Sequence, residues 1–339
     1  MTETAVDPSS ITDPAPITAP VPVIALVPPE LSGQRFDQIA AELFPDYSRA
    51  RLQSWIKSGD LTVAGSPAKA KDKLHTGSQL ELRARLEPTN PEWQAEAIAL
   101  DIVFEDDDIL VLNKPAGLVV HPAAGHADGT LLNALLHHCP ALEMIPRAGI
   151  VHRLDKDTTG LMVVAKTLQA QAHLVEQLQA RSVHREYNAI VCGVMIGGGS
   201  VDAALGRHPR DRQRQAVLAN GGKEALTHYR VLERFRAHTH IVCLLETGRT
   251  HQIRVHMAHI HFPLVGDPVY GGRFRMPAGA DASLIDMLRD FPRQALHARR
   301  LELIHPRRDE LLSWEVPLPD DMQRLLAALQ SDRQAHVDV

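Results

Sequence analysis

One aspartate in this chain lies between basic side chains on a short polar segment. The segment His152–Gly160 places Asp155 between Arg153 and Lys156, with two threonines shortly after them. The apolar run Leu161–Ala165 that follows indicates a buried strand, and polar residues at the end of a rigid strand often carry chemistry. An ionised, positioned aspartate can act as a covalent nucleophile without a metal ion or cofactor. The alternative interpretation is a solvated turn whose Asp and Thr side chains cap the next element.

Two further segments could complete an active site around this aspartate. In Arg185–Ala189, Tyr187 opens a β-prone run and offers a ring for stacking and a hydroxyl for proton transfer. In Glu246–His256, a glycine turn precedes a helix that presents Arg254, and Thr250 is the expected N-cap of that helix. An arginine beside a carboxylate keeps it ionised. We therefore expect this arginine to hold the aspartate through two hydrogen bonds.

The composition is that of a globular protein without a membrane span. The 339 residues are 44% hydrophobic and 23% charged, and neither a signal peptide nor a spanning apolar run is visible. The cysteines Cys139, Cys192 and Cys243 show no pair spacing, so we expect no disulfide and a cytoplasmic protein. The net charge of -5 conceals basic clusters such as Arg207–Arg214. Such clusters suit a nucleic-acid partner better than the total charge does.

Length and composition predict two domains and two tails. We expect a disordered N-terminal tail over residues 1–20, a small α/β domain over 21–90, a larger catalytic domain over 91–330 and a C-terminal tail over 331–339. In the larger domain strand-like runs outnumber helical ones and lack a regular β-α-β alternation. We therefore expect an α+β domain with a large, mainly antiparallel or mixed sheet.

The elements of the larger domain follow from local patterns. The turn Lys114–Gly117 is expected to lead into a short strand over Leu118–His121, and a further strand is expected over Tyr187–Cys192. Helices are expected over Leu131–His138 and Leu168–Arg181.

The small domain should present one basic helix face. We expect a helix over Arg49–Ser58, on which Arg49, Gln53 and Lys57 recur every four residues and share a face. Such a face could contact RNA phosphates, although a solvated face is the alternative.

The three chemistry-bearing segments together resemble the motifs of the RluA family of RNA pseudouridine synthases. The resemblance rests on His152–Asp155 with Thr158–Gly160, on Arg185–Tyr187 and on Gly248–His256, and it extends over residues 22–330. The small domain resembles an S4 RNA-binding domain. The resemblance implies an isomerase that needs no cofactor and no metal ion. Such an enzyme converts uridine in RNA to pseudouridine by breaking the N-glycosidic bond and rejoining the ribose to C5.

The resemblance also implies roles for individual residues. Asp155 matches the catalytic aspartate, Arg254 the arginine that pairs with it, and Tyr187 the tyrosine that stacks on the target base. Attack on C1′, attack on C6 and deprotonation of the sugar all remain open for the aspartate. The expected substrate-binding residues are Arg153, which holds the flipped-out nucleotide, the apolar Ile253, the motif residues His152, Thr250 and His251, and Arg49 and Lys57 of the small domain.

Motifs outside these segments indicate which RNA is the substrate. Residues 121–126, 201–209, 264–273 and 294–298 are most similar to the branch of the family that modifies 23S ribosomal RNA. The resemblance therefore implies 23S RNA or a pre-50S ribosomal particle as the partner, the helix 69 stem-loop as the target, a monomer and no membrane contact. Other 23S sites and transfer RNA are the alternative substrates, although the S4-like domain disfavours the branch that modifies transfer RNA.

Two other function classes compete with this interpretation. Nineteen histidines suggest a metal hydrolase, but no H-E-x-x-H or comparable spacing is present. A non-catalytic RNA-binding protein of the S4 type would explain the small domain. It would not explain why Asp155, Tyr187 and Arg254 all lie in contexts that match the family.

Overall fold

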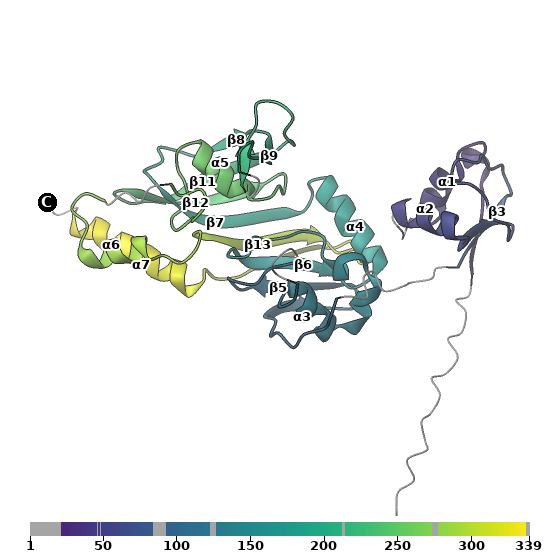
Figure 1. The fold of residues 1–339 in the computed structure, drawn as a ribbon, viewed down its shortest axis with the longest axis horizontal. Helices are drawn as coiled ribbons and strands as arrows, with labels where there is room; N and C mark the ends of the chain where they lie inside the picture. The colour runs from purple at the N-terminus through teal and green to yellow at the C-terminus, as the bar shows by residue number, and fades with distance from the viewer. Residues whose placement is uncertain are drawn as a thin grey trace, which may run out of the picture. The chain divides into compact units, whose positions relative to one another are not determined.

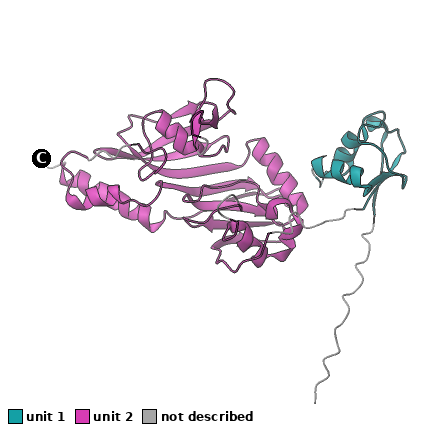
Figure 2. Cartoon of the chain, viewed as in Figure 1, with its two compact units in different colours: residues 1–87 teal, residues 88–339 magenta. Residues whose placement is uncertain are grey.

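The computed structural model describes residues 22–45, 47, 49–83, 93–122, 127–211, 214–272 and 277–336. The chain divides into two compact units, residues 1–87 and residues 88–339 (Figure 2). The predicted N-terminal tail and the predicted boundary at residue 90 lie outside the described residues. None of the helices in the described ranges combines the length and the apolar composition that a membrane span requires.

The first unit combines a three-stranded sheet with two α-helices (Figure 1). Both strand pairings are antiparallel, with β3 in the centre. Phe36, Leu52 and Leu80 are fully buried in its own apolar core. The elements are β1 (Val23–Leu26), the 3₁₀ helix η1 (Pro29–Leu31), α1 (Phe36–Leu43), α2 (Arg49–Ser58), β2 (Leu61–Val63) and β3 (Gln79–Leu82).

The second unit is built on a nine-stranded sheet with the order β4-β5-β6-β13-β7-β12-β11-β8, and β14 pairs with β13. In this sheet β6 and β13 pair in parallel and the other strand pairs are antiparallel. The predicted α+β class with a mainly antiparallel, mixed sheet is confirmed. The strands are β4 (Ile102–Glu105), β5 (Ile109–Lys114), β6 (Thr159–Ala165), β7 (His184–Cys192), β8 (Gly199–Asp202), β11 (Leu226–Arg234), β12 (His238–Leu245), β13 (Leu296–Ile304) and β14 (Leu311–Glu315), with β9 (Leu205–Arg207) and β10 (Gln215–Val217) as a separate pair.

Helices cover both faces of this sheet near its centre. Every residue of β6 is buried. Because side chains alternate along a strand, Met162 and Val164 join the core that includes α3, whereas Leu161 and Val163 join the core that includes α4. The α-helices are α3 (Leu131–His138), α4 (Leu168–Gln179), α5 (Gln252–His259), α6 (Ala282–Arg289) and α7 (Asp320–Ala335), and the short 3₁₀ helices are η2 (Pro140–Met144) and η3 (Pro146–Gly149).

The predicted strand over Leu118–His121 is wrong. Apart from an isolated bridge between Val119 and Thr130, the segment forms no strand. Its carbonyl groups instead accept the N–H groups of Leu131 and Leu132 in the first turn of α3, at distances of 2.8 and 3.2 Å. These N–H groups have no partner inside the helix, so the segment serves as a cap rather than a sheet edge.

One predicted helix limit is also wrong. Helix α4 ends at Gln179 because the chain reverses at Arg181, which has a left-handed φ of 61°. Helix α7 continues to Ala335, although we expected a tail from residue 331. Leu329 is buried and Arg333 pairs with Glu233 at 2.8 Å, so tertiary contacts hold the helix on both sides of residue 331.

Candidate active site

Asp155 lies on the loop that enters β6, and a buried lysine supports this loop. Lys114, at the end of β5, is fully buried, and its Nζ donates to the carbonyl oxygens of Pro115, Leu118 and Lys156 at 2.7, 3.0 and 2.9 Å. Burial lowers the pKa of Lys114 to about 8, although the charges of Asp157 and Asp155 oppose this shift. The contact with Lys156 fixes the backbone one residue after the aspartate.

Arg293 and Gln294 hold the next part of the same loop. Arg293 Nη1 donates to the Asp157 carbonyl oxygen at 3.2 Å, and Gln294 Nε2 donates to Thr158 Oγ1 at 3.0 Å. Arg293 is itself fixed by two hydrogen bonds to Asp321 of α7, at 2.7 and 2.9 Å. The loop is therefore held from both sides before it becomes a strand.

Gly160 allows the loop to join the centre of the sheet. Its φ is 114°, and a Cβ at this position would lie 2.2 Å from the Ala298 carbonyl oxygen on β13. The two residues face each other in the parallel β6–β13 pair. Only glycine permits this approach, so the register that places Asp155 depends on it.

Arg254 joins two carboxylates, one of which the sequence did not reveal. Its Nη1 lies 3.0 Å from Asp155 Oδ2, so the two residues form an ion pair as expected. The expectation of two hydrogen bonds to Asp155 is wrong. The bidentate contact goes to Asp267, with Nε–Oδ2 at 2.7 Å and Nη2–Oδ1 at 2.9 Å. Asp267 is more buried than Asp155 and occupies the Nε and Nη2 atoms of the guanidinium. Only Nη1 is left to bond to Asp155.

Asp267 is held independently of the arginine. Its Oδ1 accepts the backbone N–H groups of Val269 and Tyr270 at 2.9 and 3.0 Å. Burial raises the pKa of Asp267, but the hydrogen bonds and charge of Arg254 outweigh burial and keep this pKa below its usual value. In the sequence, residues 264–273 pointed only to the branch of the family that modifies 23S RNA, and not to a role for Asp267. The sequence Gly266-Asp267-Pro268 was the signal that could have identified an anchored carboxylate.

The N-terminus of α5 is built differently from the prediction. The N-cap is His251, which has a left-handed φ of 57° and forms no side-chain cap, so the expected cap by Thr250 is wrong. Gln252 instead fixes the turn before the helix, because its Oε1 accepts from the Arg249 N–H at 3.0 Å and from the Thr247 hydroxyl at 2.8 Å. Its Nε2 donates to β11. These bonds anchor the turn of α5 that carries the arginine.

His251 faces the aspartate from this turn. Its Nε2 lies 3.8 Å from Asp155 Oδ1, and its Nδ1 lies 2.9 Å from the Tyr270 hydroxyl. Burial lowers the pKa of His251, although the charge of Asp155 opposes the shift. The imidazole is therefore mainly neutral at pH 7.

Tyr187 lies on β7, next to β13, and is only 5% exposed. Burial raises the pKa of its hydroxyl, which the charge of Arg185 partly offsets. The hydroxyl therefore stays protonated at neutral pH, and the ring forms part of the wall around the aspartate.

One cavity of about 550 Å³ unites the predicted catalytic-domain residues, a volume within the range of small-molecule sites. The loop before β6, the strand β7 and the start of α5 each contribute to its wall. Of the predicted site residues, the lining includes His152, Arg153, Asp155, Tyr187, Thr250, His251, Ile253 and Arg254.

The two remaining predicted site residues lie in the first unit. Arg49 Nη2 pairs with Asp37 Oδ2 at 2.9 Å, and Gln53 donates to the same oxygen at 2.8 Å. Burial raises the pKa of Asp37, but hydrogen bonds from Arg35 and Arg49 outweigh it and hold the pKa far below its usual value. The Arg49 side chain is still 53% exposed, and Lys57 is exposed. The basic face thus includes an arginine that also stabilises its own fold.

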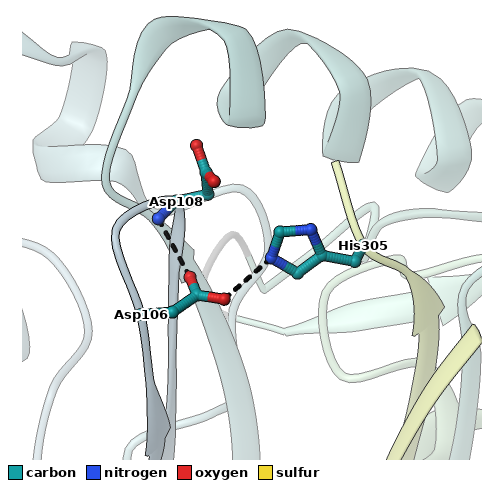
Figure 3. A group of neighbouring side chains, drawn as sticks. All are labelled: Asp106, Asp108 and His305. Carbon is teal, nitrogen blue, oxygen red and sulfur yellow. Dashed lines mark hydrogen bonds and ion pairs between the residues drawn. The ribbon is translucent and has the colours of Figure 1, made fainter. Parts of the chain in front are cut away.

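A second group of acidic and imidazole side chains lies at the β4–β5 turn (Figure 3). His305 Nδ1 accepts backbone N–H groups from Arg307 and Arg308 at 3.2 and 3.1 Å, so its proton is on Nε2, which donates to Asp106 at 2.8 Å. Asp108 pairs with Arg307 at 2.8 Å. With the imidazole lone pair already used, this donor set ties the turn to the β13–β14 hairpin and does not suit a metal ion.

Comparisons with known proteins identify relatives of this chain. A family described as RNA pseudouridylate synthase matches residues 108–259. The chain is 64% identical over 310 residues to the ribosomal large subunit pseudouridine synthase D of Pseudomonas aeruginosa, covering 91% of this chain and 96% of that protein. It is 55% identical over 305 residues to the protein of the same name from Xanthomonas campestris, covering 90% and 92%.

A solved structure shares the fold of the catalytic unit. The structure titled human RNA pseudouridylate synthase domain containing 4 superposes with a TM-score of 0.52 at 28% identity. The match covers 68% of this chain and 92% of the human chain.

Proposed function

The chain belongs to the RNA pseudouridylate synthase family and is an RNA pseudouridine synthase, and from this membership we propose that it acts on 23S RNA of the large ribosomal subunit. The names of the relatives from Pseudomonas aeruginosa and Xanthomonas campestris support the choice of ribosomal RNA. The motifs outside the active site support the helix 69 stem-loop as the target. The substrate is either free 23S RNA or a pre-50S particle, and the enzyme works as a monomer.

We propose that Asp155 is the nucleophile or base of the reaction. The observation that carries this assignment is the Arg254 guanidinium, which is fixed by Asp267 and offers its remaining edge to Asp155 inside the cavity. An ionised carboxylate held in this way is ready for covalent or proton-transfer chemistry. Attack on C1′, attack on C6 and removal of a sugar proton all begin from the same ionised carboxylate.

The proposed reaction balances without a cofactor. The N1–C1′ bond of uridine breaks and the C5–C1′ bond forms, while C5 loses a proton and N1 gains one. Substrate and product therefore have the same composition and oxidation state. The chain has to supply a positioned carboxylate, a site for the detached base and proton transfer.

The other cavity residues would bind the extruded nucleotide. Tyr187 stacks on the base, Ile253 packs against it, and the exposed Arg153 holds the nucleotide outside the helix. Extrusion costs a few kcal/mol and is cheapest in a loop, which agrees with a stem-loop target. His152, Thr250 and His251 complete the substrate contacts, and the S4-like first unit contacts flanking RNA through Arg49 and Lys57.

Pseudouridine mapping tests this proposal. The ribosomal RNA of a strain that lacks this gene should lack pseudouridine in helix 69, and the gene should restore it. Pseudouridine restored only in transfer RNA, or only elsewhere in 23S RNA, would overturn the substrate but not the enzyme class.

An Asp155→Asn variant tests the catalytic assignment. It should keep its fold and RNA affinity, because the amide oxygen can still accept from Arg254, but it should lose detectable isomerisation. Asp157→Asn is the matched control, because it makes the same chemical change two residues away in the same loop. A rate for Asp155→Asn within about tenfold of wild type would contradict the assignment.

A further inference from the structure

A cationic side chain without a partner lies in the wall of the cavity. Arg185 is only 8% exposed, its Nε is buried without a hydrogen-bond partner, and its guanidinium forms no ion pair or hydrogen bond with any residue that the structure describes. Arg254, which lines the same cavity, pairs with two carboxylates. Burying an unpaired cation is costly unless an anion or a strong acceptor joins it.

The backbone aims Arg185 at the site of chemistry. Arg185 and Tyr187 are two positions apart on β7, so their side chains leave the same face of the strand, roughly 6.5 Å apart along it. Gly248 accommodates the guanidinium, because a Cβ at that position would lie 2.8 Å from Arg185 Nη1. Both Arg185 and Gly248 line the cavity.

His152 supplies a second donor without a partner in the same cavity. Its Nε2 accepts the backbone N–H of Val163 at 3.0 Å, so in the neutral ring the proton resides on Nδ1. That Nδ1 is buried and has no partner among the described residues. Burial and the nearby charge of Arg185 lower the pKa of His152 to about 3, so the ring is a neutral N–H donor at physiological pH.

We propose that Arg185 and His152 form a subsite for a backbone phosphate beside the target uridine. This inference rests on the proposed RNA substrate; it adds Arg185 to the substrate-binding residues and names a phosphate as the group that Arg185 and His152 bind. The phosphate supplies the negative charge that Arg185 lacks, and a second phosphate oxygen accepts from His152. Charge-assisted hydrogen bonds of arginine to phosphate are among the strongest in proteins.

The charge of the group favours a phosphate over a uracil carbonyl. A uracil oxygen is neutral and would leave the Arg185 charge uncompensated in a wall that is largely sealed from water. The position also agrees, since Arg185 is displaced along β7 from the ring on which the base is proposed to stack. The subsite would hold the strand while the base occupies the space beside Asp155.

RNA with one neutral linkage tests this subsite on the full-length protein. Two probes are helix 69 stem-loops that carry one methylphosphonate each, one on the 5′ side and one on the 3′ side of the target uridine. A third probe has only normal phosphates and is called unmodified RNA. All three carry 2′-O-methyl groups on the nucleotides that flank the uridine. Binding is measured by fluorescence anisotropy, so turnover is not required. For the wild type, one of the two methylphosphonates should weaken binding roughly 10- to 100-fold, as expected for loss of a charged hydrogen bond.

The variants then identify the protein side of the contact. Arg185→Gln should bind unmodified RNA roughly 10- to 100-fold more weakly than the wild type does. The slope of log affinity against log salt concentration should fall by about 0.7. For this variant, the methylphosphonate that weakens wild-type binding should reduce the affinity by less than about twofold. His152→Asn should bind unmodified RNA roughly fivefold more weakly than the wild type does, and it should bind the sensitive methylphosphonate RNA with wild-type affinity.

Arg230→Gln is the matched control. Arg230 lies on β11 with a side chain that is 66% exposed and faces Glu186 on the opposite face of the sheet. This variant should bind both RNAs as the wild type does. Equal losses for Arg185→Gln on unmodified and neutral RNA, or wild-type binding that neither methylphosphonate weakens, would overturn the subsite.

Failure of the proposed substrate would be seen separately. If the wild type forms no pseudouridine in unmodified helix 69 RNA lacking 2′-O-methyl groups, the substrate proposal fails. The methylphosphonates are then placed around the uridine that the mapping identifies, and the same comparison decides the subsite.

Discussion

Two carboxylates share the Arg254 guanidinium, and they contribute in different ways. Asp267 has a fully buried side chain and takes the bidentate contact, whereas Asp155 is 15% exposed and takes a single hydrogen bond. The more buried carboxylate fixes the arginine, and the more accessible one faces the cavity. An exposed reactive group supported by a buried partner keeps its orientation while it remains free to react.

Asp267→Asn should therefore lower the rate rather than the affinity. The amide cannot accept both guanidinium hydrogen bonds and the two backbone N–H groups with its single oxygen, so Arg254 should shift away from Asp155. Misplacement on this scale costs about 10- to 100-fold in kcat, with KM nearly unchanged. Single-turnover kinetics on saturating RNA measures this. A reduction confined to KM would show that Asp267 serves RNA binding instead.

Arg254→Lys provides the companion measurement. A lysine can pair with one carboxylate but cannot reproduce the fork, so its rate should lie between those of the wild type and Arg254→Ala. Full activity of the lysine variant would mean that the bidentate contact with Asp267 is not needed.

The limits of sequence analysis are also clearest for single residues. That Asp155, Tyr187 and Arg254 lie around one cavity could be predicted, because a motif and a local strand or helix pattern coincide at each of them. The roles of Asp267, Lys114 and the unpaired Arg185 Nε could not be predicted. They depend on burial and on partners that are distant along the chain.

At the scale of elements, Gly160 links the catalytic loop to the sheet. Gly160→Ala should destabilise the protein by about 2–4 kcal/mol, because the positive φ adds strain and the new Cβ would meet the backbone of β13. Urea unfolding measures the stability, and isomerisation should fall with it because the loop carrying Asp155 is displaced.

Gly129→Ala separates the two causes of this destabilisation. Gly129 also has a positive φ, of 64°, but a Cβ there would meet nothing within 4 Å. Gly129→Ala should lower the free energy of unfolding by only about 1 kcal/mol, the cost of the left-handed conformation for a residue with a Cβ. Equal costs at the two glycines would show that backbone strain alone, and not contact with β13, explains the effect.

Regular elements were predicted well, and element ends were not. The core pattern identified α2 and β6 because apolar periodicity records burial directly. The segment Leu118–His121 has the composition of a strand, but its carbonyl groups serve α3 instead. The predicted N-cap of α5 was wrong for a related reason. The start of this helix is held by Gln252, which forms hydrogen bonds with the preceding turn and with β11. Local composition does not specify such distant partners.

For the whole molecule, buried and half-buried histidines make stability depend on pH. Burial lowers the pKa of His152 to about 3 and of His121, His238, His240 and His297 to about 4. The unfolded chain takes up protons near pH 6.5 while the native state does not. Stability is therefore complete above pH 6.5 and is lost as the pH falls toward 4, by up to about 1.4 kcal/mol per pH unit for each histidine.

Urea unfolding between pH 7.5 and 5 measures this dependence. His238→Asn should reduce the slope by one histidine's share, whatever its effect at pH 7. A free energy of unfolding that stays constant as the pH falls from 6.5 to 5 would contradict the assignment of these rings as neutral.

The two units should be separable. Each has its own apolar core, so a chain of residues 88–339 should fold. It should bind RNA more weakly, and the log–log salt slope should fall by about 0.7–0.9 for each RNA phosphate that the first unit neutralises in the full-length protein. Salt titration of binding measures this. An unchanged slope would show that the first unit, including Arg49 and Lys57, does not contact RNA.

The position of β13 also has a consequence for the order in which the protein forms. This strand, residues 296–304, lies between β6 and β7 and thereby separates the strand that follows Asp155 from the strand that carries Tyr187 (Figure 1). During synthesis both earlier strands leave the ribosome with one edge unpaired, and such edges invite association with other chains. Pairings this distant along the chain also slow folding. The wall of the cavity is therefore incomplete until β13 has been made, so a chain that ends between residues 267 and 296 should contain all the proposed catalytic residues and still have no active site.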